Sequence, residues 1–303
     1  MIEIKLFGKK MKNPTILASG ILGVTKQSLE RVAKEGAGAV TTKSLTTEPR
    51  KGHEGPNIVE TDCGLINAMG YPNPGIKDGL TEFSDWKMKE PLIISTAGKD
   101  RDEFSELAST IEKSKIKCAA LEAAISCPHT PGYGLMAGQS DPESVSKTVK
   151  AIKKKTKIPL IVKLSPSTPG EVAAAKEAEK AGADAINMGN TLGPGMKIDI
   201  ERKKPVIGFG CGGLSGPAMK PVALRCVYDI YESVKIPIIG TGGITTGEDL
   251  IEYVMAGATA VGVGTAVHYR GLSSFRRISD EAKTWLEDHG YSNIKDIIGA
   301  AHD

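Results

Sequence analysis

Short apolar runs rich in β-branched residues recur along the chain, and segments with the spacing of amphipathic helices separate them. These runs lack polar alternation, which indicates strands that are covered on both faces, as in a parallel sheet. Eight strands are predicted in this way, at residues 14–18, 39–43, 91–95, 118–125, 159–164, 184–188, 237–240 and 259–264.

A weak internal repeat marks where helices end and strands begin. EGAGAV (35–40), AGADAI (181–186) and AGATAV (256–261) each follow a helix-like segment and lead into a predicted strand. The glycine stands where the end of a helix needs a left-handed residue. If four units separate Gly36 from Gly182 and two separate Gly182 from Gly257, each unit has about 37 residues. This size suits one strand–helix unit.

Eight strand–helix units predict an α/β fold, a (β/α)8 TIM barrel formed by residues 1–303 as one domain. Two segments, 44–90 after the second strand and 189–235 after the sixth, are longer than barrel loops. Both follow the strand ends where barrel active sites are built, so we expect these long inserted loops to be functional. A doubly wound sheet is the alternative, although no strand is followed by GxGxxG. Capping-box spacing predicts helix starts at Ser140, Thr168 and Thr245.

Composition narrows the class of protein. The chain is 40% hydrophobic and 25% charged, which excludes a disordered chain, and its net charge of +3 is too small to indicate nucleic-acid binding. The five cysteines are scattered without C-x-x-C spacing, which argues against disulfides and against a structural metal or iron–sulfur site. No signal-peptide pattern or apolar run long enough for a membrane span is present, so a cytoplasmic protein is expected.

Glycine-rich ends of the last two predicted strands suggest a phosphate site. The segments IGTGGI (239–244) and VGVGTA (261–266) fall where barrels of this kind bind phosphate. Gly242, Gly243, Gly264 and Thr265 could present backbone N–H groups to the anion. The alternative is that these glycines only form turns.

Two lysines and a cysteine end other strands. Lys43 and Lys163 would point into the barrel mouth, which is costly unless they meet an anionic or polar ligand. Together with the phosphate loops they suggest a cofactor with a phosphate tail and an electron-rich head, such as FMN. Cys127 follows the fourth strand in a loop that contains Gly132, Gly134 and Gly138, which favours a base or nucleophile on a mobile lid over a packing cysteine.

Nine motifs in order give the chain a family resemblance over essentially its whole length. It resembles the soluble class 1 dihydroorotate dehydrogenases, and most of all the archaeal type of class 1B catalytic subunit. The resemblance implies FMN-dependent oxidation of dihydroorotate to orotate in pyrimidine (UMP) biosynthesis. It also implies a homodimer, or a heterotetramer with an iron–sulfur FAD reductase subunit, with no membrane association. The motifs are LASG (17–20), TTKS (41–44), LINAMGYPNPG (65–75), ISCP (125–128), VKLSP (162–166), NTL (190–192), GGLSGPAMKP (212–221), IGTGGI and VGTA (263–266).

The same resemblance implies roles for individual residues. Cys127 corresponds to the general base, which removes a proton while a hydride passes to flavin N5. The implied FMN contacts are Ser19, Lys43, Ser44, Lys163, Gly189, Gly216, Gly242, Gly243, Gly264 and Thr265. The implied substrate contacts are Lys43, Asn67, Ala68, Met69, Gly70, Tyr71, His129, Asn190 and Thr191. No metal ligand is implied.

The sequence departs from the family pattern at two positions. Ala124 stands where the family has an asparagine, and His129 stands where it has another. Alternatives therefore stay open at this point: an FMN enzyme for another dihydropyrimidine or an enone, or a binding protein that has lost activity. An alternative of another class is an FMN-free isomerase or aldolase that uses Lys43 or Lys163.

Overall fold

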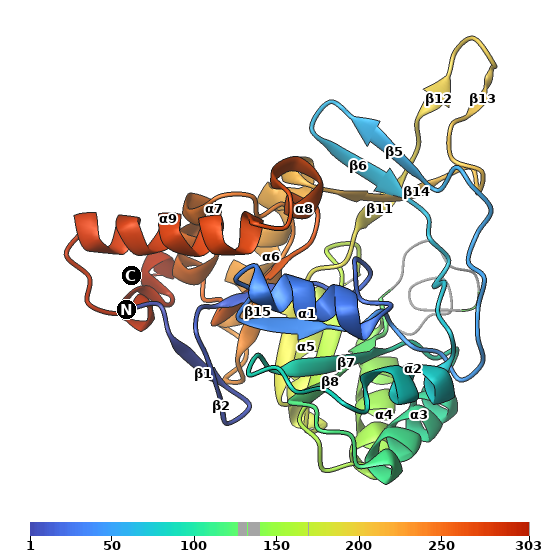
Figure 1. The fold of residues 1–303 in the computed structure, drawn as a ribbon, viewed down its shortest axis with the longest axis horizontal. Coiled ribbons are helices and arrows are strands. Elements are labelled where there is room, and N and C mark those ends of the chain that lie inside the picture. The colour runs from blue at the N-terminus through green and yellow to red at the C-terminus, as the bar shows by residue number, and fades with distance from the viewer. Residues whose placement is uncertain (127–131, 133–139, 169, 303) are drawn as a thin grey trace.

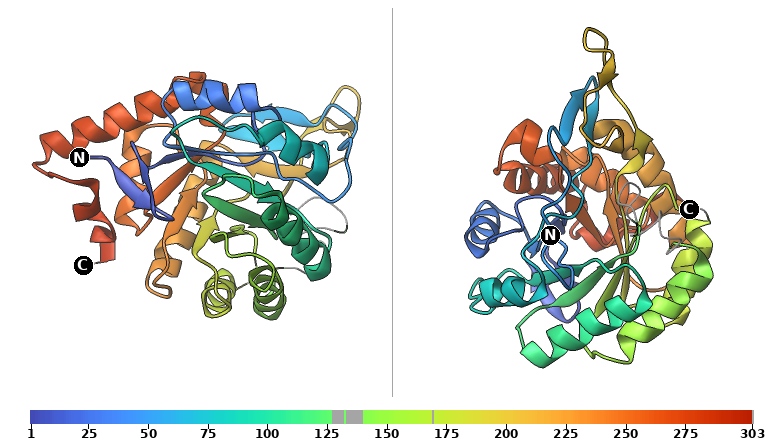
Figure 2. Two further views of the ribbon diagram at one scale, coloured as in Figure 1. Left: turned by 60° about the horizontal axis from the view of Figure 1, so that its bottom comes forward. Right: turned by 90° about the vertical axis from the view of Figure 1, so that its right-hand side faces the viewer.

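The fold is a closed barrel of eight parallel strands surrounded by helices (Figures 1 and 2). The computed structural model describes residues 1–126, 132, 140–168 and 170–302. All eight predicted strands are present, and their ends agree with the prediction to within two residues. The barrel strands are β3 (Thr15–Leu17), β4 (Ala39–Thr41), β7 (Leu92–Thr96), β8 (Ala120–Ala124), β9 (Leu160–Leu164), β10 (Ala185–Met188), β15 (Ile238–Thr241) and β16 (Ala260–Val263).

Helices cover the outside of the barrel and bury one apolar side each against the strands. In α1, for example, Leu29, Val32 and Ala33 are buried at helical spacing, while the remaining side chains are partly or fully exposed. The helices are α1 (Lys26–Lys34), α2 (Ile76–Phe83), α3 (Arg101–Ser114), α4 (Pro142–Lys153), α5 (Glu171–Lys180), α6 (Lys220–Tyr231), α7 (Gly247–Met255), α8 (Ala266–Arg270) and α9 (Ser274–Asp288), with 3-10 turns η2 (Pro217–Met219), η3 (Ile294–Ile297) and η4 (Ala300–His302).

The repeated glycines have the predicted backbone conformation. Gly36, Gly182 and Gly257 have φ of +114°, +102° and +111°, which an L side chain adopts only with strain. Gly257 also lies against Tyr231, so that a Cβ there would come within 2.2 Å of the ring. The repeat therefore marks the turn from a helix into the next strand, as its position after each helix predicts.

The three predicted helix caps are wrong by one or two residues. The α4 N-cap is Asp141, which accepts from Ser144 N, while Ser140 Oγ is buried and donates to Ile125 O. The α7 N-cap is Thr246, whose capping box is completed by Asp249. The α5 N-cap is Gly170, with no side-chain hydrogen bond, in place of Thr168. The helices α4 and α7 begin one residue later than predicted because Asp141 and Thr246 also have side chains that can cap them. The helix α5 begins two residues later because the chain turns at Gly170.

The two long insertions fold onto each other above the barrel, which the sequence does not predict. The antiparallel sheet β11-β14-β6-β5 takes two strands from each insertion and lies at the upper right of Figure 1. The strands are β5 (Ile58–Thr61), β6 (Gly64–Asn67), β11 (Leu192–Gly195) and β14 (Gly212–Ser215). A hairpin of β12 (Ile198–Asp199) and β13 (Lys204–Pro205) projects beyond this sheet, and a second hairpin, β1 (Ile4–Leu6) and β2 (Lys9–Met11), begins the chain.

Candidate active site

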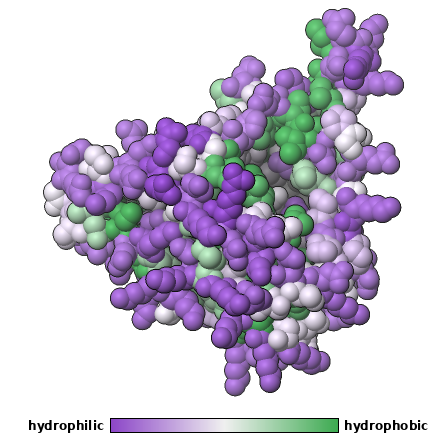
Figure 3. Space-filling model, in the orientation of Figure 1, coloured by the Kyte–Doolittle hydropathy of each residue, from purple (hydrophilic) through white to green (hydrophobic). Residues whose placement is uncertain are grey.

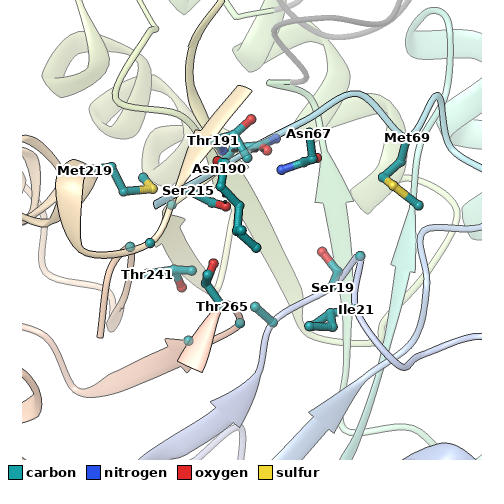
Figure 4. Close-up of a pocket in the computed structure, with 18 of the residues that line it drawn as sticks. Ser19, Ile21, Asn67, Met69, Asn190, Thr191, Ser215, Met219, Thr241 and Thr265 are labelled. Atoms are coloured by element: carbon teal, nitrogen blue, oxygen red, sulfur yellow. Dashed lines mark hydrogen bonds between the residues drawn. The ribbon is translucent and has the colours of Figure 1, made fainter. Parts of the chain in front are cut away.

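A pocket of about 260 Å³ lies between the C-terminal ends of the barrel strands and the inserted sheet. This volume suits a small organic molecule and far exceeds the space of one water or ion. In Figure 4, Asn67, Asn190 and Thr191 line one side, and Ser19 and Ile21 line the opposite side. On the face shown in Figure 3, hydrophobic side chains gather over the inserted sheet beside a hollow. The insertions thus form the roof of the pocket and the barrel forms its floor.

The predicted phosphate loops line one end of this pocket. Gly242 and Gly243 follow β15, and Gly264 and Thr265 follow β16. Gly243 has φ of +70°, and a Cβ there would come within 2.8 Å of Gly216 O. Tyr253 Oη fixes the loop from beneath by donating to Gly242 O at 2.7 Å. A side chain cannot be added without moving the backbone, so the loop can approach a ligand closely through its main chain.

The two lysines are buried at the pocket wall, as predicted. Lys43 is 6% exposed and Lys163 is 5% exposed, and both line the pocket. Lys163 Nζ donates to Ser19 Oγ at 2.8 Å and lies 4.0 Å from Glu122 Oε1. Burying ammonium groups costs free energy unless negative charge or acceptors compensate. Ser19 and Glu122 supply part of this compensation for Lys163.

Amide and hydroxyl groups supply directional hydrogen bonds on the roof side. Asn67 Nδ2 donates to Gly213 O at 3.4 Å, and Asn190 Nδ2 donates to Ser126 Oγ at 3.4 Å. Both bonds are long and therefore weak, although the Asn190 amide is also held by Thr191 N, which donates to its Oδ1 at 2.9 Å. Thr191 Oγ1 is buried and makes no hydrogen bond within the described residues. This hydroxyl packs against Gly213, where an added Cβ would come within 1.9 Å of it.

The loop after β6 holds its pocket residues in an unusual backbone conformation. Gly70 and Tyr71 have φ of +71° and +56°, and the second value is strained for a tyrosine. Asn73 stabilises this turn: its Nδ2 donates to Thr46 Oγ1 at 2.9 Å and to Tyr71 O at 2.8 Å, and its Oδ1 accepts from Gly75 N at 2.9 Å. Asn73 therefore holds the loop that carries Met69, Gly70 and Tyr71 to the pocket.

Most residues that the resemblance assigns to the site do line one pocket. Ala68 does not: it is fully buried in a small apolar cluster with Ile66 and Ile207, because alternate residues of β6 and its continuation face away from the cavity. Cys127 and His129 lie outside the described residues, as does the proposed lid around Gly134 and Gly138. The residues found at the pocket are Ser19, Lys43, Ser44, Asn67, Met69, Gly70, Tyr71, Lys163, Gly189, Asn190, Thr191, Gly216, Gly242, Gly243, Gly264 and Thr265.

Ala124, the departure from the family pattern, lies beside Lys163 in the β8–β9 register, so its methyl group occupies the wall next to the ammonium group. Several other pocket residues are missed by sequence reasoning. They are Ala18, Gly20, Ile21, Ile58, Leu65, Ser215, Met219, Thr241, Ile244, Gly262 and His268. Ile58 and Ser215 belong to the inserted sheet, whose pairing gives no local signal. Thr241 could have been found, because it ends a predicted strand within the IGTGGI motif.

The described residues contain neither a candidate metal site nor a helix that could span a membrane. Within them, no group of three or more His, Cys, Asp or Glu side chains could hold a metal ion. Nor does any helix among them combine the length and apolar character that crossing a bilayer requires. Cys63, Cys118, Cys211 and Cys226 are free thiols. Burial raises the pKa of Cys118 and of Cys226 to about 11, which keeps both thiols protonated and unreactive at neutral pH.

Fold and pocket together define a class: a (β/α)8 barrel with a pocket at the strand ends, lined by glycine loops after the last two strands and by two buried lysines. The family model described as "Dihydroorotate dehydrogenase" matches residues 1–286. The chain belongs to this family, which is one of oxidoreductases that are generally flavoenzymes. This membership removes the basis for the isomerase or aldolase alternative.

Relatives cover the whole chain. It is 49% identical over 300 residues to the "Dihydroorotate dehydrogenase B (NAD(+)), catalytic subunit" of Pyrococcus furiosus, with 99% of this chain and 98% of the relative covered. The protein of the same name from Methanocaldococcus jannaschii is 43% identical over 308 residues, covering 100% and 99%. A solved structure of DHODH from Eimeria tenella in complex with ferulenol has a TM-score of 0.84 at 24% identity, covering 99% of this chain and 88% of that one. At that identity the structural likeness supports the fold alone.

Proposed function

We propose that the chain oxidises dihydroorotate to orotate with FMN as its resident cofactor and Cys127 as the general base. The observation that carries this proposal is the convergence of three kinds of group on one pocket. Main-chain loops at Gly243 and Gly264 suit a phosphate, Lys43 and Lys163 suit an electron-rich ring, and roof amides such as Asn190 suit a planar imide.

The residues present fit FMN. The pocket lining combines glycine main chain in the loops after β15 and β16 with the buried ammonium groups of Lys43 and Lys163. A phosphate can be held at Gly242, Gly243, Gly264 and Thr265 without a competing side chain. Lys163 then stands beside Ser19 as a positive charge for a reduced ring. When bound, FMN supplies the acceptor for the hydride that leaves the substrate.

The protein's own residues orient the substrate and handle its proton. The ammonium group of Lys43 offsets the charge of the substrate carboxylate, and the amides of Asn67 and Asn190 bind its ring imide. Cys127 would take the C5 proton of the substrate. Thr191, which also lines the pocket, is a further substrate contact that the family resemblance implies.

A second subunit is part of the proposal. The relatives are named catalytic subunits of an NAD(+) enzyme, which implies a separate subunit for electron transfer. We infer that this chain forms a homodimer that assembles with an iron–sulfur FAD subunit into a heterotetramer. The cytoplasm is the proposed location.

Analysis of the purified protein tests which cofactor it holds and which substrate it oxidises. Acid release followed by chromatography should yield FMN, and not FAD, in equal amount to protein. Dihydroorotate with a dye acceptor should yield orotate, whereas dihydrouracil, which lacks the carboxylate, should not be oxidised. FAD in the pocket would contradict the cofactor assignment, and turnover of dihydrouracil in preference to dihydroorotate would favour the other-dihydropyrimidine alternative.

A further inference from the structure

A buried carboxylate lies directly beneath the pocket and belongs to none of the roles described above. Glu122, on β8, is 2% exposed and points into the barrel interior. Its Oε1 accepts from Ser95 Oγ at 2.9 Å, and its Oε2 accepts from Asn187 Nδ2 at 2.7 Å. Lys163 Nζ lies 4.0 Å from Oε1. A carboxylate this deeply buried needs partners of this kind, and all three partners are themselves buried.

Each hydrogen bond to Glu122 continues to a hydroxyl group at the pocket wall. On one side, Ser95 Oγ lies 2.9 Å from Ser44 Oγ. On the other side, Asn187 Oδ1 accepts from Thr241 Oγ1 at 2.9 Å. Ser44 and Thr241 both line the pocket, whereas Ser95 and Asn187 do not. Glu122 is therefore the meeting point of two hydrogen-bond chains that begin at the pocket.

The charge of Glu122 fixes the direction of both chains. An ionised carboxylate only accepts, so the single O–H of Ser95 is used toward Glu122. Ser95 Oγ must then accept from Ser44, so the hydroxyl proton of Ser44 points to Ser95 and is not available to a ligand in the pocket. The amide of Asn187 donates to Glu122, so its oxygen accepts the hydroxyl proton of Thr241. Both wall hydroxyls consequently face the pocket with lone pairs and act as acceptors.

Glu122 also moderates the positive charge at the wall. Lys163 has three N–H donors and spends one on Ser19, and its separation from Glu122 is too long for a hydrogen bond. The ammonium group thus stays available to the pocket while a negative charge 4.0 Å below weakens its field.

We propose that Glu122 is a positioning residue that sets Ser44 and Thr241 as acceptors toward the bound flavin and limits how strongly Lys163 stabilises the reduced ring. This inference rests on the proposed function, because it takes the pocket ligand to be FMN. A purely structural carboxylate would affect folding stability but neither the potential nor the affinity of the flavin.

Glu122→Gln tests the proposal because glutamine keeps the shape but removes the charge. Ser95 and Asn187 donate to different oxygens of Glu122, and glutamine replaces one of these oxygens by an NH2 donor, so one chain must reverse or break. We expect flavin affinity to fall about tenfold, the free-energy equivalent of one charged hydrogen bond. We also expect the flavin potential to become more positive, because the reduced anionic ring gains the full field of Lys163.

Glu179→Gln is the matched control. Glu179 accepts from Lys235 N at 2.7 Å and Ile236 N at 3.0 Å, so it is also a hydrogen-bonded carboxylate, but it does not line or underlie the pocket. Its variant should lose some stability and keep the wild-type potential and flavin affinity. Equal potentials in the wild type and Glu122→Gln would overturn the proposal.

If Glu122→Gln does not fold, Ser95→Ala provides a second test of the proposal. It removes one small hydroxyl group, leaves the carboxylate in place and frees the proton of Ser44. Flavin affinity should fall severalfold with little change in potential, and the effect should vanish in a Ser44→Ala background. An additive effect in that background would contradict the chain through Ser44. A wild-type chain that binds no FMN would instead contradict the proposed function, and the inference with it.

Discussion

Lys163 Nζ donates to Ser19 Oγ at 2.8 Å across the mouth of the barrel, although the two residues are 144 positions apart. The bond joins the end of β9 to the loop after β3 and holds the ammonium group at the pocket wall. Because Lys163 is only 5% exposed, its position is set by the barrel and not by solvent. The ammonium group is therefore preorganised at the pocket wall, where the proposed function gives it the role of stabilising negative charge on the flavin.

Lys163→Ala should lower the flavin potential and slow flavin reduction by dihydroorotate, because the reduced anionic ring loses a positive charge at the pocket wall. A redox titration against a dye of known potential measures the first effect, and stopped-flow absorbance measures the second. Lys153→Ala serves as the control, because Lys153 pairs with Asp184 at the outside of the barrel. An unchanged potential in Lys163→Ala would remove this assignment.

Gly243→Asp should abolish tight FMN binding. The new side chain would meet Gly216 O, and its charge would repel the phosphate. We expect affinity to fall by about 100-fold or more, which corresponds to an unpaired buried charge. Gly290→Asp is matched to it: that glycine also has a positive φ, +74°, but a Cβ added there would meet nothing within 4 Å. Full flavin content in Gly243→Asp would place the phosphate elsewhere.

Ala124→Asn should tighten orotate binding. Ala124 lines the pocket next to Lys163, where the related enzymes are expected to carry an amide. One added hydrogen bond corresponds to about 0.5–1.5 kcal/mol, or several-fold in the dissociation constant. The spectral shift of the flavin on orotate addition measures it. Weaker binding would mean that the pocket has been rebuilt around other groups, and the substrate assignment would then lose support.

Asp249→Asn should destabilise the fold most at neutral pH. Burial alone would raise the pKa of Asp249, but hydrogen bonds from Lys220, Thr245 and Thr246 outweigh it and hold the pKa below the usual value. A lowered pKa stabilises the fold above the unfolded-state value, about 3.9, and this contribution disappears as pH falls through the folded-state value.

Denaturant unfolding of Asp249→Asn should show a loss of about 1.5–3 kcal/mol at neutral pH and a smaller difference from wild type in acid. Asp280→Asn, at an exposed position on α9, should change little at any pH. A difference between Asp249→Asn and wild type that is constant over pH would rule out the charge as its cause.

Cys127→Ser should slow flavin reduction by orders of magnitude while orotate still binds, because a serine hydroxyl is a far weaker acid than a thiol. In the wild type the reduction rate should rise with pH toward the thiol pKa, near 8.5 for an unperturbed cysteine. Stopped-flow measurements across pH on both proteins test this. A serine variant with a near wild-type rate and pH profile would exclude Cys127 as the base.

The barrel can be predicted from the sequence because its signals are local. Most strand residues are apolar and buried, and at three of the helix-to-strand turns the repeat places a glycine, such as Gly182, whose positive φ the turn requires. The helix caps are harder to place because neighbouring residues compete for the same role, as Thr246 does with Thr245.

The roof of the pocket cannot be predicted in the same way. β6 pairs with β14 across about 150 residues, and neither strand has a length or pattern that reveals its partner. The sequence alone does not single out Glu122, since its importance depends on Ser95, Asn187 and Lys163 meeting inside the barrel. Motif resemblance groups most wall residues correctly but includes Ala68, whose side chain faces the other way.

Anaerobic titration of the purified protein with dihydroorotate tests the central claim most directly. The account predicts that the yellow flavin absorbance bleaches in proportion to added dihydroorotate until about one equivalent per flavin is consumed, with one orotate formed for each flavin reduced. Flavin that stays fully oxidised after excess dihydroorotate, in a protein that is folded and loaded with FMN, would contradict it.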